Sequence, residues 1–179
     1  MASQEMRLER DSMGELEVPI NAYYGGNTRR AELNFPISNL RLGRSFIKAI
    51  GQIKQSAAVV NLQLGEIDKK IANAIIDASQ RVIDGEFDDQ FVVDVFQTGS
   101  GTSTNMNSNE VISNIAIESL GGELGSRSPV HPNDHVNKGQ SSNDVFPSTI
   151  HLAAAVAIKD SLIPALNELE DSLRKKSDE

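Results

Sequence analysis

The spacing of apolar residues between positions 46 and 82 constrains this fold more than any other feature. Intervals of four and three residues separate the apolar side chains of two runs, which are Phe46, Ile50, Ile53, Ala57, Val60 and Leu64, then Ile67, Ile71, Ala74, Ala78 and Val82. This spacing puts the side chains of each run on one face of a helix. Gly65 and Gly85 follow the two runs, as glycine often does at a left-handed helix C-terminus. The pattern therefore predicts two helices joined by a short turn and packed as an antiparallel pair.

The remaining chain contains further elements around this pair. Residues 1–44 are rich in glycine and proline, which predicts an irregular segment with a short hairpin. The run FVVDVF at 91–96 is typical of either a strand or a buried helical turn, and its periodicity does not separate the two. Residues 110–120 are predicted to be helical, with Gly121 and Gly122 at the end.

The last segment, residues 148–176, is predicted to form one long helix. Its leucines form a seam on one face, and they are Leu162, Leu166, Leu169 and Leu173. Pro164 is expected to kink this helix or to remove one backbone hydrogen bond. The pairs Glu170–Arg174 and Asp171–Lys175 have the favourable i,i+4 order. Few residues follow to cover the seam, so we expect it to pack against a partner outside these 179 residues.

Composition excludes several classes of function. The chain is 39% hydrophobic and 23% charged, which is typical of a globular protein. Its net charge is −8 and its basic residues are scattered, which argues against nucleic-acid binding. It has no cysteine, so disulfides, thiolate metal sites and cysteine nucleophiles are excluded. No run of 18 apolar residues and no hydrophobic N-terminal stretch is present, so we expect no membrane segment and a cytoplasmic location.

The segment QTGSGTSTNMNSNE at 97–110 is the first candidate site. It has so little apolar surface that we expect it to contribute nothing to a core. Gly99 and Gly101 permit positive φ and a close approach to a ligand. Ser103 or Thr104 is expected to cap the next helix, whose free N–H groups attract an anion. The hydroxyls of the flanking residues, Ser100 and Thr102, add donors for a carboxylate. The alternative is a polar loop that only caps a helix.

The segment GQSSNDVFPST at 139–149 has the same character. Ser141, Ser142 and Asn143 are small donors at a predicted helix start, and Pro147 is expected just inside the helix, where its missing N–H matters least. Simple capping is again the alternative. Two such starts in one chain favour convergence on one ligand, and together they would bind a dianion without an arginine.

The segment HPNDHVNK at 131–138 has two histidines four residues apart, which is compatible with a metal site. Pro132 and the lack of a nearby third ligand favour a polar turn or an anion-binding loop instead. We expect Asp134 and Lys138 to form a local ion pair. No P-loop, G-x-G-x-x-G or G-x-S-x-G motif is present.

Taken together, these motifs resemble the class II fumarases of the fumarase/aspartase superfamily. TGSGTSTNMNSNE, HPNDHVN and GQSSNDVFP match in order and spacing, and so do ERDSMGELEVP near the start and IPAL in the last helix. The resemblance begins at about residue 7 and extends through essentially the whole remaining chain. The set of motifs is highly specific.

The resemblance implies a function and a fold. The family reaction is the reversible hydration of fumarate to (S)-malate, without a redox cofactor or a required metal. Its fold is mainly α, with a small N-terminal helical domain that has minor β-structure, followed by a long-helix bundle. Here this implies an N-terminal lyase domain at 1–138 and the beginning of the bundle at 139–179. The family assembles as a homotetramer whose active sites are shared between subunits.

The resemblance also assigns residues to these sites. Ser100, Gly101 and Thr102 match a loop that contacts a substrate carboxylate, and Ser141, Ser142 and Asn143 match a second substrate loop. The segment from His131 through Pro132 and Asn133 to Asp134 matches a secondary anion site outside the reaction centre.

The family's proton-transfer motifs are missing from these 179 residues. The acid–base histidine follows G-R-T-H, and the catalytic serine lies on a G-S-S-x-M-P-x-K-x-N loop, neither of which occurs here. We therefore assign no catalytic residue and expect an N-terminal portion that is inactive alone. One alternative is an aspartate ammonia-lyase fragment, although G-S-G-T and Q-S-S-N, in place of the G-A-G-T and Q-S-T-N of aspartases, favour fumarase. The other alternative is a non-catalytic helical assembly module.

Overall fold

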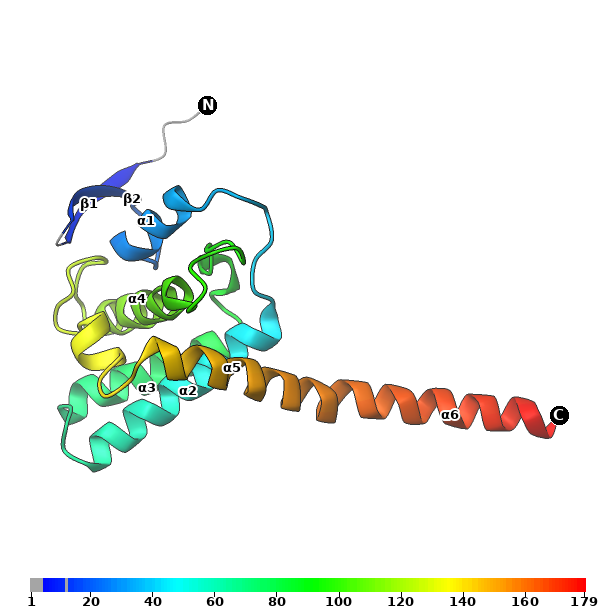
Figure 1. The fold of residues 1–179 in the computed structure, drawn as a ribbon. Coiled ribbons are helices and arrows are strands. Elements are labelled where there is room, and N and C mark those ends of the chain that lie inside the picture. Colours follow the sequence, from blue (N-terminus) through cyan, green and yellow to red (C-terminus); the bar gives the residue numbers. More distant parts are fainter. Residues whose placement is uncertain (1–4, 12) are drawn as a thin grey trace.

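The computed structural model describes residues 5–11 and 13–179. Over these residues the protein is mainly helical, as predicted, and its strands form one two-stranded sheet. Helix α4 (Thr102–Ser119) lies between the N-terminal hairpin with α1 on one side and the α2–α3 pair on the other (Figure 1). Helix α6 (Ile163–Asp178) extends far from this body.

The N-terminal segment contains the predicted hairpin. Strand β1 (Met6–Asp11) pairs antiparallel with β2 (Gly14–Pro19). Gly14 begins the second strand with φ +117°, a conformation that glycine adopts without strain.

Helix α1 (Gly26–Asn34) was not predicted, and a distant carboxylate holds its N-terminus. Gly25 is the N-cap and has no side chain, so Glu110 of α4 accepts the free donors. One carboxylate oxygen accepts the N–H groups of Gly25 at 2.9 Å and Thr28 at 3.0 Å, and the Thr28 hydroxyl at 2.6 Å. The other accepts the N–H and the side-chain amide of Asn27 at 3.0 and 2.9 Å. Because this cap lies more than 80 residues away along the chain, the local sequence carries no signal for it.

The predicted helix pair is confirmed as α2 (Arg44–Gln63) and α3 (Lys69–Asp84), which pack against each other. The Asp68 side chain caps α3, and Gly85 ends it in the left-handed conformation with φ +92°. The predicted apolar face of α2 is only partly buried. Ile50 is fully buried, whereas Val60 is 50% and Leu64 70% exposed.

The run 91–96 is neither of the predicted alternatives. It follows a short 3-10 turn, Asp88–Gln90, and has no helix or strand assigned. Phe91 and Val93 are nevertheless buried, so the run contributes apolar side chains to the core without a hydrogen-bonded ladder.

Helix α4 starts eight residues before the predicted helix at 110, and it is buried from Asn107 to Ile117 on every side. The prediction that residues 97–110 add nothing to the core is wrong, since their buried members are Gly101, Thr104, Asn105, Asn107, Ser108, Asn109 and Glu110. Hydrogen bonds compensate this burial: Asn107 donates to the Gln90 carbonyl at 2.9 Å, and Ser108 donates to the Asn105 carbonyl at 2.8 Å.

The long C-terminal helix is continuous but has a π-helical turn. Helix α5 (Ser142–Ala157) leads through Ile158–Leu162 into α6, so the helix starts six residues earlier than predicted. The wider turn immediately precedes Pro164, where an α-helical carbonyl would meet the proline ring. Pro147 lies six residues into α5, not just inside its start as predicted, so its missing N–H leaves the Asn143 carbonyl without its usual helical donor.

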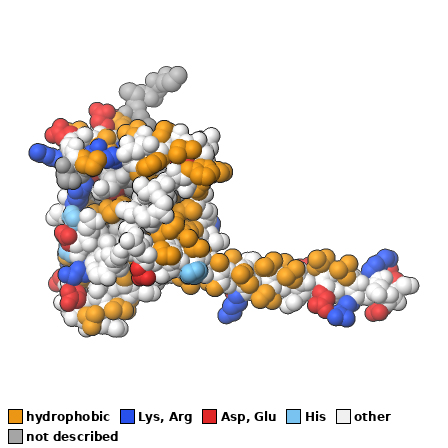
Figure 2. Space-filling view, viewed as in Figure 1, with side chains coloured by type: hydrophobic (Ala, Val, Ile, Leu, Met, Phe, Trp, Pro, Cys, Tyr) orange, Lys and Arg blue, Asp and Glu red, His pale blue; other side chains and the backbone are white. Residues whose placement is uncertain are grey.

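The leucine seam of this helix is exposed, and the partner expected to cover it stays a prediction. Leu166 is 53% and Leu173 63% exposed, and apolar side chains run along the projecting helix (Figure 2). The predicted Glu170–Arg174 pair is present at 2.6 Å.

Candidate functional site

The N-terminus of α4 lies at the glycine-rich segment. Gly101 is the N-cap, with φ +69°, whereas Gly99 does not adopt positive φ. The predicted caps, Ser103 and Thr104, lie in the first turn instead. Gln97 caps one of the free N–H groups in their place, since its side-chain oxygen accepts the Thr104 N–H at 2.9 Å.

Two donors of this helix start remain available to a ligand. The helix geometry gives the N–H groups of Thr102 and Ser103 no partner within α4. The hydroxyls of Ser100 and Thr102 lie 3.0 Å apart, and both residues are exposed. The arrangement is suited to an anion, because donors and the positive end of the helix dipole coincide there.

The start of α5 has a similar form. Ser141 is the N-cap, and its hydroxyl oxygen accepts the Asn143 N–H at 3.2 Å. This confirms the capping interaction that the sequence allowed. Ser142 is the first residue of the helix, and its N–H has no partner within α5.

The two helix starts meet in the structure. The side-chain amide of Asn105, in the first turns of α4, donates to the Ser142 hydroxyl oxygen at 3.1 Å. Phe146 of α5 packs directly on Gly101, where a Cβ atom would lie 2.2 Å from the ring. Glycine is therefore required at this position both by φ and by space. The sequence alone predicted donors at the N-terminus of each helix, and the structure shows that the two N-termini lie next to each other.

Lys54 is a further residue at this junction, and the sequence analysis did not identify it. It lies in the middle of α2, and its Nζ donates to the side-chain oxygens of Asn105, Asn137 and Gln140 at 2.8, 3.0 and 2.9 Å. A lysine on the apolar side of α2 was the available signal.

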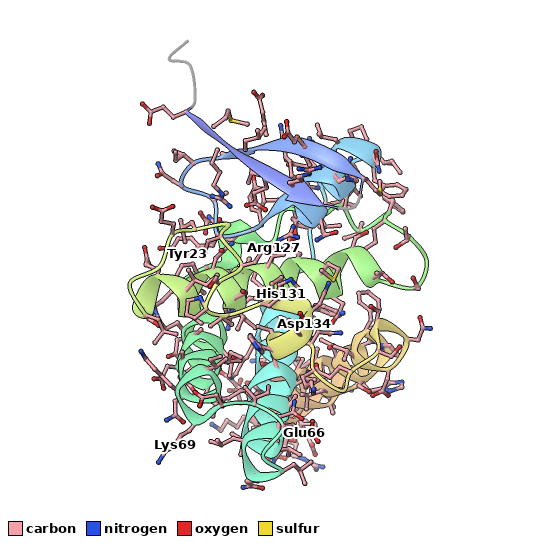
Figure 3. All side chains as sticks on the ribbon, turned by 90° about the vertical axis from the view of Figure 1, so that its left-hand side faces the viewer. Tyr23, Glu66, Lys69, Arg127, His131 and Asp134 are labelled. Carbon is pink, nitrogen blue, oxygen red and sulfur yellow. The ribbon has the colours of Figure 1, made fainter. Side chains whose placement is uncertain are left out.

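The segment His131–Asp134 forms a separate turn that packs on α4 (Figure 3). His131 Nδ1 accepts the N–H groups of Asn133 and Asp134 at 3.3 and 3.1 Å and lies 3.2 Å from the Asp134 carboxylate. Pro132 is buried beneath the turn. The predicted pairing of Asp134 with Lys138 is wrong, because Lys138 lies instead 3.5 Å from the Glu66 carboxylate.

His135 faces back into this turn. Its Nδ1 accepts the His131 backbone N–H at 2.9 Å, and burial lowers the pKa of its imidazole. Among the described residues, no three histidine, aspartate or glutamate side chains gather in a way that could hold a metal ion.

Comparison with known proteins places these features in a family. The family model described as lyase matches residues 14–179. The chain belongs to this lyase family. It is 54% identical over 176 residues to the class II fumarate hydratase of Halobacterium salinarum, covering 98% of this chain and 37% of that protein. It is 55% identical over 182 residues to human mitochondrial fumarate hydratase, covering 100% of this chain and 36% of that protein.

A solved structure agrees with these relatives. The crystal structure of class II fumarase from Schistosoma mansoni matches with a TM-score of 0.92 and 41% identity, over 96% of this chain and 36% of that one. The resemblance to class II fumarases and the mainly α fold are thus confirmed. The chain spans little more than a third of the length of these relatives.

The continuous helix Ser142–Asp178 is long and apolar enough to cross a membrane by length and composition alone. The family match includes the whole of this helix, so we assign it to the lyase fold.

Proposed function

We propose that this chain is the N-terminal part of a fumarate hydratase, which adds water reversibly to fumarate to give (S)-malate. The observation that supports this most strongly is the meeting of the α4 and α5 N-termini, joined by the 3.1 Å contact of Asn105 with Ser142. The high identity to class II fumarate hydratases across the chain favours this activity over the aspartate ammonia-lyase alternative.

In this proposal the two helix starts bind the substrate carboxylates. Ser100, Gly101 and Thr102 provide one set of donors, and Ser141, Ser142 and Asn143 provide the other. Donors that already point at a carboxylate stabilise the negative charge that develops on it when a proton leaves the adjacent carbon. The turn from His131 to Asp134 is proposed as a secondary anion site outside the reaction centre.

Other parts of the full-length protein complete the site. Ser100, Thr102, Ser141 and Asn143 are exposed, so this chain offers an open surface rather than an enclosed cavity. We propose a homotetramer in which further subunits close this surface and supply the acid and base. Residues 1–138 would form the N-terminal domain, and residues 139–179 would begin the bundle.

The full-length enzyme would act in the tricarboxylic acid cycle. A cytoplasmic location stays a prediction, since the human and rat relatives are mitochondrial enzymes.

Fumarate absorbance provides the primary test of the activity. The full-length protein should hydrate fumarate, whereas the 179-residue chain alone should show no turnover, because carboxylate donors without an acid and a base leave most of the barrier in place. Ammonia release from L-aspartate, with malate inert, would support the ammonia-lyase instead. Rapid hydration by the isolated chain would refute the assignment of roles.

Thr102→Ala tests the α4 loop in the full-length protein. We expect kcat/KM to fall about 100-fold without a change in thermal unfolding, because one donor to a developing negative charge is lost. Thr102→Ser keeps the hydroxyl and should retain most activity. An unchanged rate for Thr102→Ala would remove this loop from the site.

The exposed leucine seam also suits a non-catalytic assembly module. That reading predicts association without any turnover by the full-length protein, so the same absorbance assay separates it from the enzyme.

A further inference from the structure

We propose that Lys54 is a buried positioning residue for the substrate site, acting on a bound carboxylate through Asn105 and Ser142. This inference rests on the proposed carboxylate site and adds a residue outside the two loops that contact the ligand. It assigns a role to a charged side chain that the packing of α2 alone does not require.

The contacts of Lys54 are complete and specific. Its side chain is fully buried, at 0% exposed. An ammonium group has three N–H donors, and the amide oxygens of Asn105, Asn137 and Gln140 accept all of them. These acceptors come from α4 and from the segment that leads into α5. One cation therefore ties α2 to the two helix starts.

In the described part of the chain, no acidic residue neutralises this cation. Among residues 5–11 and 13–179, no carboxylate forms an ion pair with Lys54, and amides alone solvate its charge. Burial correspondingly lowers the pKa of Lys54 to about 7. A buried charge without a counter-ion is unfavourable in itself, and an apolar side chain would hold the same elements together more cheaply. The charge thus has a use beyond packing.

From Lys54 to Ser142, each group donates its hydrogen bond to the next group outward. Its ammonium group fixes the orientation of the Asn105 amide by donating to Oδ1. The Nδ2 group of that amide then donates to the Ser142 hydroxyl oxygen at 3.1 Å and to Asn137 Oδ1 at 3.2 Å. Since the Ser142 oxygen already accepts a hydrogen bond, its proton is available to donate outward to a ligand.

Hydrogen bonds that run in one direction polarise one another. A positive charge at the inner end strengthens the donor at the outer end, and an anion there favours the charged form of the lysine in return. Lys54 would thus provide the cationic attraction that an arginine provides in other carboxylate sites, without touching the ligand.

The test measures binding of succinate to the full-length protein by calorimetry. Succinate is a four-carbon dianion that cannot be hydrated, so it reports binding without turnover. Lys54→Met replaces the side chain with an unbranched one that is one atom shorter, and it removes the charge and the donors. We expect its dissociation constant for succinate to rise about 100-fold, as for the loss of a charged hydrogen-bond donor. The matched control is Lys48→Met, an exposed lysine of the same helix, which should bind as the wild type does.

A double-mutant cycle separates positioning from general destabilisation. If Lys54 acts through Ser142, then Lys54→Met should add little to the binding defect of Ser142→Ala. Simple multiplication of the two defects would show independent action and would overturn the proposal. So would wild-type succinate binding by folded Lys54→Met.

If Lys54→Met does not fold, the same succinate-binding measurements on Asn105→Ala test the proposal. This variant interrupts the relay and leaves Lys54 with two acceptors. It should weaken succinate binding and be non-additive with Ser142→Ala, and wild-type binding or additivity would overturn the proposal.

The inference and the proposed function fail differently. A wild-type protein that binds succinate but hydrates no fumarate would refute the proposed activity, while the variants still test Lys54. Fumarate hydration without measurable succinate binding would uphold the activity and overturn the inference.

Discussion

Helices α4 and α6 are buried in the reverse order of what their apolar patterns suggest, since the helix that begins with polar turns is buried and the helix with a leucine seam is exposed. The first turns of α4 are almost entirely polar, yet most of this helix is buried. Helix α6 has a regular leucine seam, yet it contains no buried residue. In α4, polar side chains are buried because partners from several segments meet them: Ser113 donates to the Val130 carbonyl at 2.8 Å, and Asn114 donates to the Tyr23 carbonyl at 2.8 Å.

The comparison teaches that burial follows from available partners as well as from hydropathy. Within the described chain, each buried polar side chain of α4 has a hydrogen-bond partner, and Asn109 Oδ1 is the one buried polar atom of the helix without one. The leucines of α6 are 53–63% exposed among the described residues, so their full burial would require another chain or another part of this protein.

The largest effect is expected at the leucine seam. Changing Leu166 and Leu169 together to glutamate should weaken subunit association by roughly 3–6 kcal/mol per subunit, if each leucine is buried in the assembly. Light scattering after size exclusion of the full-length protein measures this. Asn167→Glu, beside the seam, is the control and should leave assembly intact. An unchanged oligomer in the double variant would mean that α6 stays exposed.

Glu110 tests the polar core of α4. Glu110→Gln places an amide group among donors, so the free energy of unfolding should fall by about 3 kcal/mol. Chemical denaturation of the full-length protein measures the loss. Glu118→Gln is the matched control on the same helix, because Glu118 is exposed and, within residues 5–11 and 13–179, accepts a side-chain hydrogen bond only from the Tyr23 hydroxyl, at 2.8 Å. Equal losses in both variants would show that burial of this carboxylate has no special importance.

Gly101 tests the junction of α4 with α5. Gly101→Ala forces a left-handed backbone on alanine and drives its Cβ into Phe146. We therefore expect the free energy of unfolding, measured by thermal denaturation, to fall by about 2 kcal/mol. At Gly99 a Cβ would meet nothing within 4 Å, and φ is not positive. Gly99→Ala should therefore change stability by less than about 0.5 kcal/mol. A reversed order would contradict the close packing at the junction.

The smallest effect is the change in stability that Lys54 causes between pH 7 and pH 8. Its folded pKa of about 7 lies below the ordinary value of 10.5, so above pH 7 the unfolded chain binds more protons than the folded one. The free energy of unfolding should therefore rise by about 1 kcal/mol between pH 7 and 8 because of this group. The comparison is between wild type and Lys54→Met in denaturant unfolding, and parallel pH profiles would show that the lysine keeps its usual pKa.

The sequence predicts those parts of the fold that depend on neighbouring residues. The α2–α3 pair, its glycine caps, the hairpin and the Ser141 cap all follow from local patterns. The motifs also predicted donors beside both helix starts, although α4 and α5 begin eight and six residues before the helices predicted from apolar spacing. In contrast, α1 depends on Glu110, and the junction depends on Lys54 and Phe146, all of which are distant along the chain. Apolar periodicity does not reveal a polar helix buried by long-range hydrogen bonds, so the extent of α4 was underestimated.

The π-helical turn at Ile158–Leu162 sets the direction, about the helix axis, in which the side chains of α6 point. A turn of this kind contains about one residue more than an α-helical turn, and each residue turns a helix by about 100°. Removing a single residue there would rotate the downstream leucines about the helix axis by more than a quarter of a turn, although the sequence of α6 itself would be unchanged. The direction in which α6 presents its apolar stripe is thus a matter of helical phase, decided just before Pro164.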